Sequence, residues 1–188
     1  MAIKDTPSDR PAAATARLRL VGLDRELARM QVEDLPGFFR ALNVNPEAAW
    51  PPELHDDATM RHTLDRLEAR PDETGWHGWV FIMRWADDAP GRLVGAGGFY
   101  GPPGGDGTVE IGYSMLPSFR EQGMATEAVK GLAGWAFGQE GVRTIRARTL
   151  ADGRASRRVL EKAGFALQGE ETDPQEGRIA LYALERPR

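Results

Sequence analysis

The stretch LPSFREQGMATEA, residues 116–128, combines a helix start signal with a glycine that weakens the helix. Ser118 followed by Glu121 is typical of a capping box, in which two side chains bind the first backbone N–H groups of a helix. Gly123 then falls in the first turns of the predicted helix, where glycine costs roughly 1 kcal/mol relative to alanine. Two explanations are open: glycine accommodates close packing here, or a ligand must approach the backbone.

The flanking residues place this stretch in a strand–helix–strand unit. TVEIGYSM (108–115) precedes it with strand-like alternation, and TIRARTL (144–150) is a second strand further on. Between them, small and apolar residues recur at helical spacing at Ala125, Ala128, Val129, Leu132, Ala133 and Ala136. A strand, a covering helix and another strand in this order predict a βαβ crossover.

The remaining segments extend this unit to a layered α/β domain. The segments 78–85, 92–100 and 108–115 are separated by turn-rich runs and predict an antiparallel meander. Further strands are expected at 16–23, 165–170 and 178–185, and further helices after Asp24, over 57–69 and over 154–164. Residues 32–56 show no regular pattern and predict a long irregular connection or a broken helix. We therefore expect a mixed sheet of six or seven strands with about four helices on both faces.

Composition restricts the class of protein. A chain of 188 residues with 41% hydrophobic and 28% charged residues favours one domain with a full core. We expect residues 1–15 to form a flexible leader and residues 16–188 to form that domain. The chain has no cysteine, which excludes disulfides, thiolate metal sites and a cysteine nucleophile and fits a reducing, cytoplasmic location. No run is apolar and long enough to span a membrane.

Charge is uneven along the chain. The net charge of −4 gives no global field for nucleic acid. Residues 141–158, however, contain six arginines against a single acidic residue, Asp152. This cluster suits an anionic ligand, and a solvated basic face explains it equally well.

The start of the helix after Leu116 is the candidate anion site. Its first N–H groups have no partner within the helix, and the helix dipole adds about half a positive charge there. A glycine at 123 leaves these groups accessible to a diphosphate, and Arg120 adds a charged donor. Glu121 is unfavourable beside a phosphate and is expected to point away.

From about Arg92 to Phe165 the chain resembles the GNAT superfamily of acyl-CoA-dependent N-acyltransferases. The resemblance rests on VEIGYSMLPSFREQGMATEAV (109–129) and ASRRVLEKAGF (155–165), and it is greatest for the branch of ribosomal-protein N-terminal acetyltransferases. The phosphate loop of the family reads Q/R-x-x-G-x-G/A, which Arg120, Gly123 and Ala125 match. The resemblance implies a GNAT-type fold in which a central strand splays from its neighbour and admits the thioester.

It also implies acetyl-CoA as co-substrate and assigns the residues that hold it. Amides of the 120–125 loop would bind the diphosphate, and the strand end would pair with the pantetheine arm through its backbone. The implied cofactor-binding residues are Met115, Leu116, Arg120, Glu121, Gln122, Gly123, Met124, Ala125 and Thr126. An exposed N–H of that strand can also stabilise the charge that develops on the thioester oxygen.

Glu110 is the candidate base. It alternates with Val109 and Ile111, so it lies on the opposite face of the predicted strand. Partial burial raises the pKa of a carboxylate toward useful values, and an alkylammonium with a pKa of about 10 must lose a proton before it attacks. The alternative is that Glu110 pairs with an arginine of 144–150 and joins two strands.

Ser156 is the candidate acid. In the resembling branch the stretch reads N-x-x-S, and its serine lies beside the departing sulfur, where a hydroxyl can donate a hydrogen bond to the thiolate. The alternative is an ordinary serine at a helix cap or in a first turn. Gly153 stands where the family usually carries asparagine, which weakens the expected hold on the cofactor; Arg154 or Arg157 can partly substitute.

Aromatic residues offer one further candidate. Most of Trp76, Trp79, Trp85, Phe99 and Tyr100 are expected in the core. Trp50 lies in the irregular segment, where packing alone does not require it, and is the candidate for lining the acceptor site.

Rival sites fit less well. GAGGFYG (95–101) lacks the last glycine of a dinucleotide fingerprint, and GYSML lacks the closing glycine of a hydrolase elbow. His55, His62 and His77 show no metal-ligand spacing, so no metal is expected.

The sequence therefore predicts a cytoplasmic N-acetyltransferase that moves an acetyl group from acetyl-CoA to a primary amine, such as a protein N-terminus or a small molecule. Without cysteine, the amine is expected to attack directly in a ternary complex. The alternative is a non-catalytic acyl-CoA-binding or regulatory module of the same fold. No nucleic-acid or membrane partner is expected, and a homodimer is compatible with the resemblance.

Overall fold

The protein is built around an eight-stranded mixed sheet with the order β1-β2-β3-β4-β5-β6-β8-β7. The computed structural model describes residues 10–84 and 89–187. The strands are β1 Ala12–Ala14, β2 Leu18–Gly22, β3 Gly78–Met83, β4 Arg92–Phe99, β5 Thr108–Met115, β6 Thr144–Leu150, β7 Ala166–Asp173 and β8 Gly177–Glu185. The helices are α1 Arg25–Glu33, α2 Leu35–Ala41, α3 Asp57–Ala69, α4 Met124–Gly138 and α5 Arg154–Ala163, with 3-10 turns η1 Pro71–Glu73 and η2 Pro117–Phe119.

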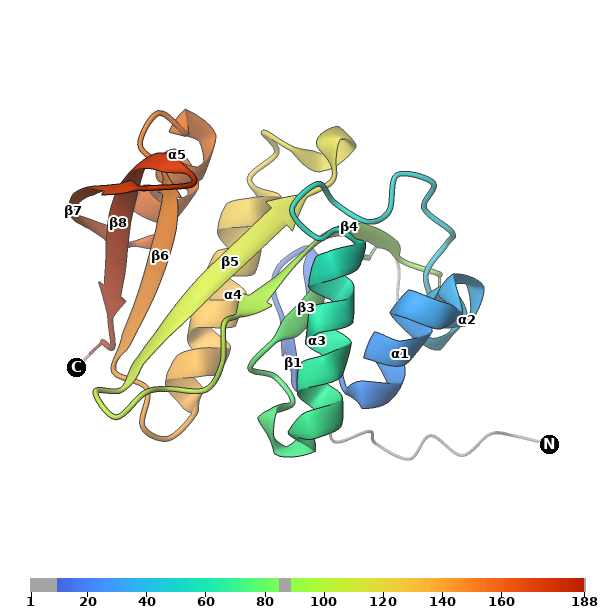
Figure 1. Ribbon diagram of the computed structural model, residues 1–188. Coiled ribbons are helices and arrows are strands. Elements are labelled where there is room, and N and C mark those ends of the chain that lie inside the picture. The colour runs from blue at the N-terminus through green and yellow to red at the C-terminus, as the bar shows by residue number, and fades with distance from the viewer. Residues whose placement is uncertain (1–9, 85–88, 188) are drawn as a thin grey trace.

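Helices cover both faces of the sheet (Figure 1). Helices α1, α2 and α3 lie over the face turned to the viewer, and α4 lies on the opposite face. Helix α5 packs against α4 and therefore covers that same face. Trp79 and Leu132 on the α4 side, and Val80 and Leu67 on the α1–α3 side, are each fully buried, so apolar side chains fill both sides of the sheet. Within the described residues, no helix is both long and apolar enough to cross a bilayer.

The expected α/β architecture is confirmed, with more elements than the pattern indicated. Eight strands form instead of six or seven, and one of them, β1, comes from the segment that was expected to be a flexible leader. The strand expected over 78–85 ends at Met83, and Trp85 lies outside the described residues. The irregular 32–56 segment contains the short helix α2, which is the broken-helix alternative.

The meander and the crossover both form as expected. Strands β3, β4 and β5 pair antiparallel in sequence, and β5 pairs parallel with β6 across α4. The β5–β6 pairing runs only from Thr108 opposite Thr144 to Ile111 opposite Ala147. Beyond these residues the two strands diverge, as Figure 1 shows in the widening gap between them.

The predicted start of the long helix is wrong. Ser118 belongs to the 3-10 turn η2, and α4 begins only at Met124. Gly123 is the residue before the helix, in the left-handed region at φ 78°, and no side chain in the described part of the chain caps α4. The capping-box pattern fails because η2 and the residues up to Gly123 form a separate loop between β5 and α4.

Candidate functional site

The diverging end of β5 exposes backbone groups to the gap beside β6. In an antiparallel pair, successive residues alternate between the partner strand and the opposite edge. The N–H of Leu116 donates to Val94 O of β4 at 2.9 Å, so the residues that face β6 are Tyr113 and Met115. Because pairing with β6 has ended, these two residues can bind an extended ligand through their backbone. Leu116, expected to take part as well, has its N–H already bonded to β4.

The loop before α4 presents an uninterrupted run of free donors. No backbone N–H from Glu121 to Thr126 donates to a protein acceptor within the described parts of the chain. Two residues of this loop have positive φ, namely Glu121 at 60° and Gly123 at 78°. Successive N–H groups around a left-handed residue form a concave nest for an anion, next to the positive end of the α4 dipole.

Gly123 is required here by its backbone conformation. Among the described residues, a Cβ built on this residue would have only Nη2 of Arg17 within 4 Å, at 3.5 Å. Crowding by packed neighbours therefore does not explain the glycine, whereas a φ of 78° does, because other residues adopt it at a cost. Of the two explanations offered for this residue, close packing does not fit the structure.

Arg120 faces the strand end and the irregular segment. Its Nε donates to Met115 O at 3.1 Å, and its Nη2 donates to Glu53 Oε2 at 3.0 Å. The guanidinium thereby connects the loop, the mouth of the gap and the segment before α3. Glu121 is exposed, and its direction away from the anion site stays a prediction.

Glu110 lies on the face of β5 opposite α4 and is partly buried. Burial raises the pKa of its carboxyl above the usual value, and the nearby guanidinium groups of Arg148 and Arg146 oppose this shift. Arg146 is its register partner on β6, yet Glu110 forms no ion pair among the residues that the structure describes. Its carboxylate is thus not held by a cross-strand ion pair.

Tyr100 is a neighbour of Glu110 that sequence reasoning missed. It was grouped with core aromatics, but it is 76% exposed. A Cβ built on Gly112 would lie 2.9 Å from its hydroxyl, so the phenol covers the face of β5 that carries Glu110. The signal for this contact was the absent side chain at Gly112, which leaves room for the ring.

On the other face of β5, the Tyr113 hydroxyl contacts the backbone of Ser156. Ser156 lies in the first turn of α5, and its carbonyl accepts a hydrogen bond from the Tyr113 hydroxyl at 3.2 Å. This bond joins β5 to α5 across the gap. Burial raises the pKa of the Tyr113 hydroxyl above its usual range, so the group remains a proton donor at neutral pH. The Ser156 hydroxyl has no protein partner among the described residues.

The glycine at 153 reflects a tight turn. A Cβ there would lie 2.9 Å from Leu150 O and 3.2 Å from Thr149 Oγ1. An asparagine would therefore displace the backbone of the β6–α5 turn. Arg157, suggested as a substitute, is already bound to Ala151 O and the Tyr182 hydroxyl, at 2.7 and 3.1 Å.

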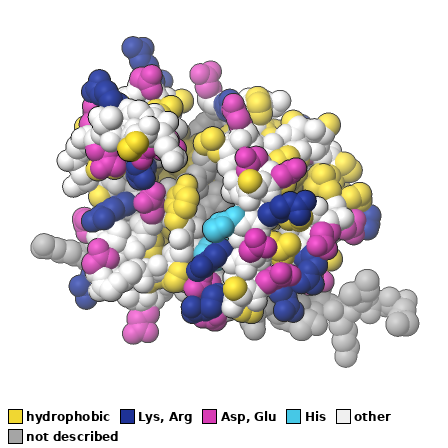
Figure 2. All heavy atoms as spheres, in the orientation of Figure 1, with side chains coloured by type: hydrophobic (Ala, Val, Ile, Leu, Met, Phe, Trp, Pro, Cys, Tyr) yellow, Lys and Arg dark blue, Asp and Glu magenta, His cyan; other side chains and the backbone are white. Residues whose placement is uncertain are grey.

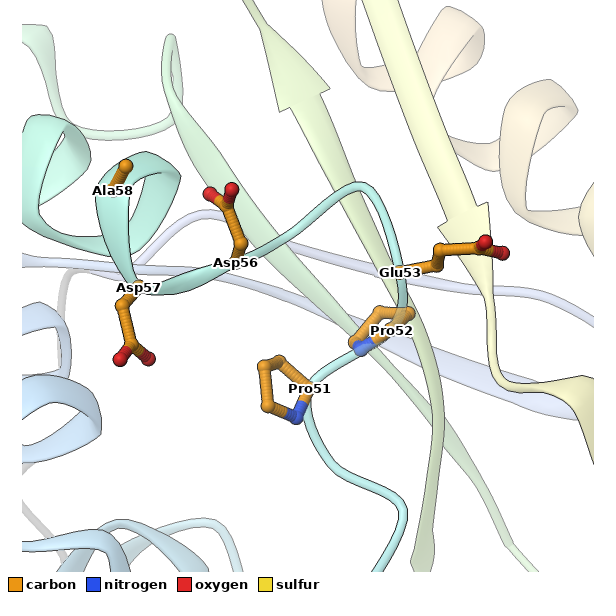
Figure 3. Close-up of a pocket in the computed structure, with 6 residues that line it drawn as sticks. All are labelled: Pro51, Pro52, Glu53, Asp56, Asp57 and Ala58. Atoms are coloured by element: carbon orange, nitrogen blue, oxygen red, sulfur yellow. The ribbon is translucent and has the colours of Figure 1, made fainter.

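Trp50 belongs to the core. It is 7% exposed and its ring lies 6.1 Å from that of Phe38, so the expectation that packing does not require it is wrong. Its indole N–H is buried without an acceptor among the described residues. A shallow pocket lies next to it, lined by Pro51, Pro52, Glu53, Asp56, Asp57 and Ala58. Figure 3 shows Glu53 directed toward the end of β5 and Asp57 directed away from it.

The surface of the molecule has a hollow beside the diverging end of β5. Figure 2 shows a hollow between the region that carries β6–β8 and the region that carries α3. Charged side chains of both signs surround it. In the residues described, no three His, Cys, Asp or Glu side chains group as a metal site would require.

Some of the arginines near α5 form ion pairs within the protein, and others lie at the surface. Arg148 pairs with Glu171 and Asp173 of β7. Arg154 and Arg158 line a shallow surface pocket with Arg157. Part of the basic cluster is therefore neutralised by ion pairs with β7, and an anionic ligand for the remainder stays a prediction.

Comparison with known proteins agrees with this arrangement. The sequence model of the acetyltransferase (GNAT) domain matches residues 25–166. The chain is 30% identical over 153 residues to the uncharacterized N-acetyltransferase YjdG of Bacillus subtilis, which covers 81% of this chain and 88% of that protein.

Solved structures show the same fold. The RimL ribosomal L7/L12 alpha-N-protein acetyltransferase in complex with coenzyme A aligns with a TM-score of 0.65 at 15% identity, covering 93% of this chain and 98% of that one. The ribosomal-protein-S5-alanine acetyltransferase of Vibrio fischeri aligns with a TM-score of 0.64 at 13% identity, covering 94% and 97%. The domain match, the relative in Bacillus subtilis and the diverging β5–β6 pair lead to one conclusion: this chain belongs to the GNAT family and is an acetyltransferase.

Proposed function

We propose that the protein transfers an acetyl group from acetyl-CoA to a primary amine by direct attack within a ternary complex. The observation that carries this proposal is the opening of β5 from β6 beside the six N–H groups from Glu121 to Thr126, which no acceptor in the described residues uses. The residues present fit acetyl-CoA. The nest suits its diphosphate, and the backbone of Tyr113 and the N–H of Met115 suit the amide groups of its pantetheine arm, whereas the Met115 carbonyl is bonded to Arg120.

The two faces of β5 would divide the chemistry. Glu110 on one face would take the proton that the attacking ammonium must lose, directly or through a water molecule. Burial raises the pKa of the Glu110 carboxyl, which makes its carboxylate form a stronger base than a solvated one. The amine nitrogen then bonds to the thioester carbon, the carbon–sulfur bond breaks, and the thiolate departs.

A hydroxyl group on the opposite side of the gap would receive that thiolate. The Ser156 hydroxyl can donate there, whereas the Tyr113 hydroxyl already donates to the Ser156 carbonyl. A hydroxyl that donates to the developing thiolate lowers the barrier to its departure. We propose Ser156 as the acid and Tyr113 as the residue that fixes the distance between β5 and α5.

The acceptor would enter from the face that carries Glu110 and Tyr100. The segment 42–58 borders this entrance, and Arg120 binds its Glu53. In this proposal Trp50 supports the segment from within the core, and a reducing cytoplasm is the expected location for a chain without cysteine.

The test is release of free thiol from acetyl-CoA in the presence of a panel of primary amines. Thiol release with at least one amine is expected, and its absence with every acceptor contradicts the proposal. Labelled acetyl-CoA added with the enzyme to a cell extract would then identify the acceptor by its mass shift.

Glu110→Gln separates an enzyme from a binding module. The substitution keeps the shape of the side chain and removes the base, so kcat is expected to fall at least a hundredfold while CoA affinity stays within twofold. In the wild type, kcat/KM should rise as pH rises through the elevated pKa of Glu110, because only the carboxylate accepts a proton. A wild type that binds CoA but shows no turnover supports the non-catalytic module.

A further inference from the structure

The segment that leads into β2 is bound to the first turn of α4. Thr15 Oγ1 donates to Glu127 Oε1 at 2.5 Å, and the backbone N–H of Arg17 donates to the same oxygen at 2.6 Å. The Nε of Arg17 donates to Glu127 Oε2 at 2.8 Å. Residues more than a hundred positions apart thus form one polar cluster beside the anion nest.

The same guanidinium also contacts the loop itself. Nη1 of Arg17 donates to the carbonyl of Gln122 at 3.1 Å. This bond turns the Gln122 carbonyl toward β2, which leaves the loop N–H groups directed elsewhere. The conformation of the loop, with positive φ on both sides of Gln122, is therefore supported from outside the loop.

Glu127 makes this arginine electrostatically necessary. A carboxylate within the first turn of α4 opposes the binding of a diphosphate at that helix end. Its partial burial favours the neutral acid, but the hydrogen bonds from Thr15 and Arg17 outweigh this effect and lower the pKa below the usual value. Glu127 is therefore charged at neutral pH, and Arg17 neutralises it.

One nitrogen of Arg17 remains for a ligand. Nη2 donates to no protein acceptor in the described residues, and it is the nearest atom to the open side of Gly123. The side chain is 46% exposed, so an anion in the nest can reach it.

We propose that Arg17 is a further cofactor-binding residue, which holds the loop through Gln122 and Glu127 and donates from Nη2 to the diphosphate of acetyl-CoA. This inference rests on the proposed function. In this proposal Arg17 binds the diphosphate of the ligand and does not contact its 3′-phosphate. It also gives the N-terminal β1–β2 region a part in binding, in addition to its place in the sheet.

Calorimetric titration with CoA, and with 3′-dephospho-CoA, tests the proposal. Arg17→Ala is expected to raise Kd about tenfold for both ligands, the effect of one lost charge-assisted hydrogen bond. Arg17→Lys keeps the charge but loses the forked geometry, so an intermediate Kd is expected. Arg29→Ala is the matched control, because Arg29 is a similarly exposed arginine paired with Glu68, and its Kd should equal that of the wild type.

Two readouts separate a direct contact from a structural role. The CoA affinity of the wild type should fall more steeply with salt than that of Arg17→Ala, because one charge–charge contact is lost. Turnover of S-acetylpantetheine, which lacks phosphate, should be unchanged by the substitution. A lysine variant as weak as the alanine variant, with an unchanged salt dependence, overturns the direct contact.

The failures of the two proposals are distinguishable. A folded wild type that does not bind CoA refutes the proposed function. A wild type that binds CoA, together with an Arg17→Ala variant of equal affinity, refutes only the role of Arg17. If Arg17→Ala does not fold, the same titrations are made with Arg17→Lys. If the CoA affinity of Arg17→Lys equals that of the wild type at every salt concentration, the role of Arg17 in binding the diphosphate is refuted.

Discussion

Two turns in this protein lead from a strand to a helix, and their backbones are used differently. The turn from β5 to α4 contains two residues of positive φ and leaves its N–H groups from Glu121 onward unpaired in the described structure. The turn from β6 to α5 is short and closed. There the Gly153 N–H donates to Leu150 O at 2.9 Å, and the Arg154 N–H donates to Asp152 O at 2.8 Å.

Both helices are preceded by a glycine, and neither is capped by a side chain of the described residues. At Gly123 the glycine permits a left-handed backbone, whereas at Gly153, with φ −70°, it permits a tight approach to Leu150 O. The comparison shows that a glycine before a helix is not evidence of an anion site by itself. What distinguishes the turn from β5 to α4 is its set of N–H groups that no acceptor among the described residues uses.

The largest expected effect is from Gly123→Val. A β-branched residue is strongly disfavoured at φ 78°, so the nest should reorganise and Kd for CoA should rise at least tenfold. Titration with CoA measures the effect, and circular dichroism confirms that the variant folds.

Gly134→Val is the matched control. Gly134 lies in the same helix, and a Cβ there would meet no atom within 4 Å. The free energy of unfolding of the Gly134→Val variant should differ from that of the wild type by less than about 0.5 kcal/mol, since valine and glycine differ little in helix propensity. Unchanged CoA affinity in a folded Gly123→Val variant would contradict the role given to the first turn.

Gly153→Asn tests the second turn with the residue that the family usually carries there. Contact of the new Cβ with Leu150 O should destabilise the protein by about 1–2 kcal/mol, which lowers Tm by roughly 4 °C in a chain of this size. CoA affinity should not improve. Tighter CoA binding without a lower Tm would contradict the conclusion that the turn from β6 to α5 requires glycine at position 153.

The smallest effect is expected from Glu121→Gly. Glycine removes the cost of a side chain at φ 60°, while the unfolded chain gains entropy, so the net stabilisation should be about 0.5 kcal/mol or less. CoA should bind up to about threefold more tightly because a carboxylate near the diphosphate is gone. Glu121→Gln separates the two causes, since it removes the charge and keeps the side chain at positive φ.

Patterns of local spacing predicted the architecture well. The helix over 57–69, the strands over 108–115 and 144–150 and the left-handed end of α5 at Gly164 all follow from periodicity and from glycine placement. The start of α4 was mispredicted because a capping box is a local signal and the loop conformation depends on Arg17, which is distant in sequence.

The candidate site was predictable only where it is local. The phosphate loop and Glu110 could be named from their strand and helix, but not the pairing of Tyr113 with Ser156 or the position of Tyr100 over Gly112. Trp50 was misjudged because its partner Phe38 lies in α2, a helix too short to be recognised from its pattern. Contacts between distant segments carry no signature in a single sequence.

The divergence of β5 and β6 also bears on solubility. Unpaired strand edges commonly recruit strands from other copies of a protein and so promote aggregation. An added strand must lie at a constant spacing of about 4.8 Å from each neighbour, and two edges that separate steadily offer that spacing at one depth only. The wedge between the strands can therefore accept a slender, flexible chain while it resists insertion of a regular β-strand.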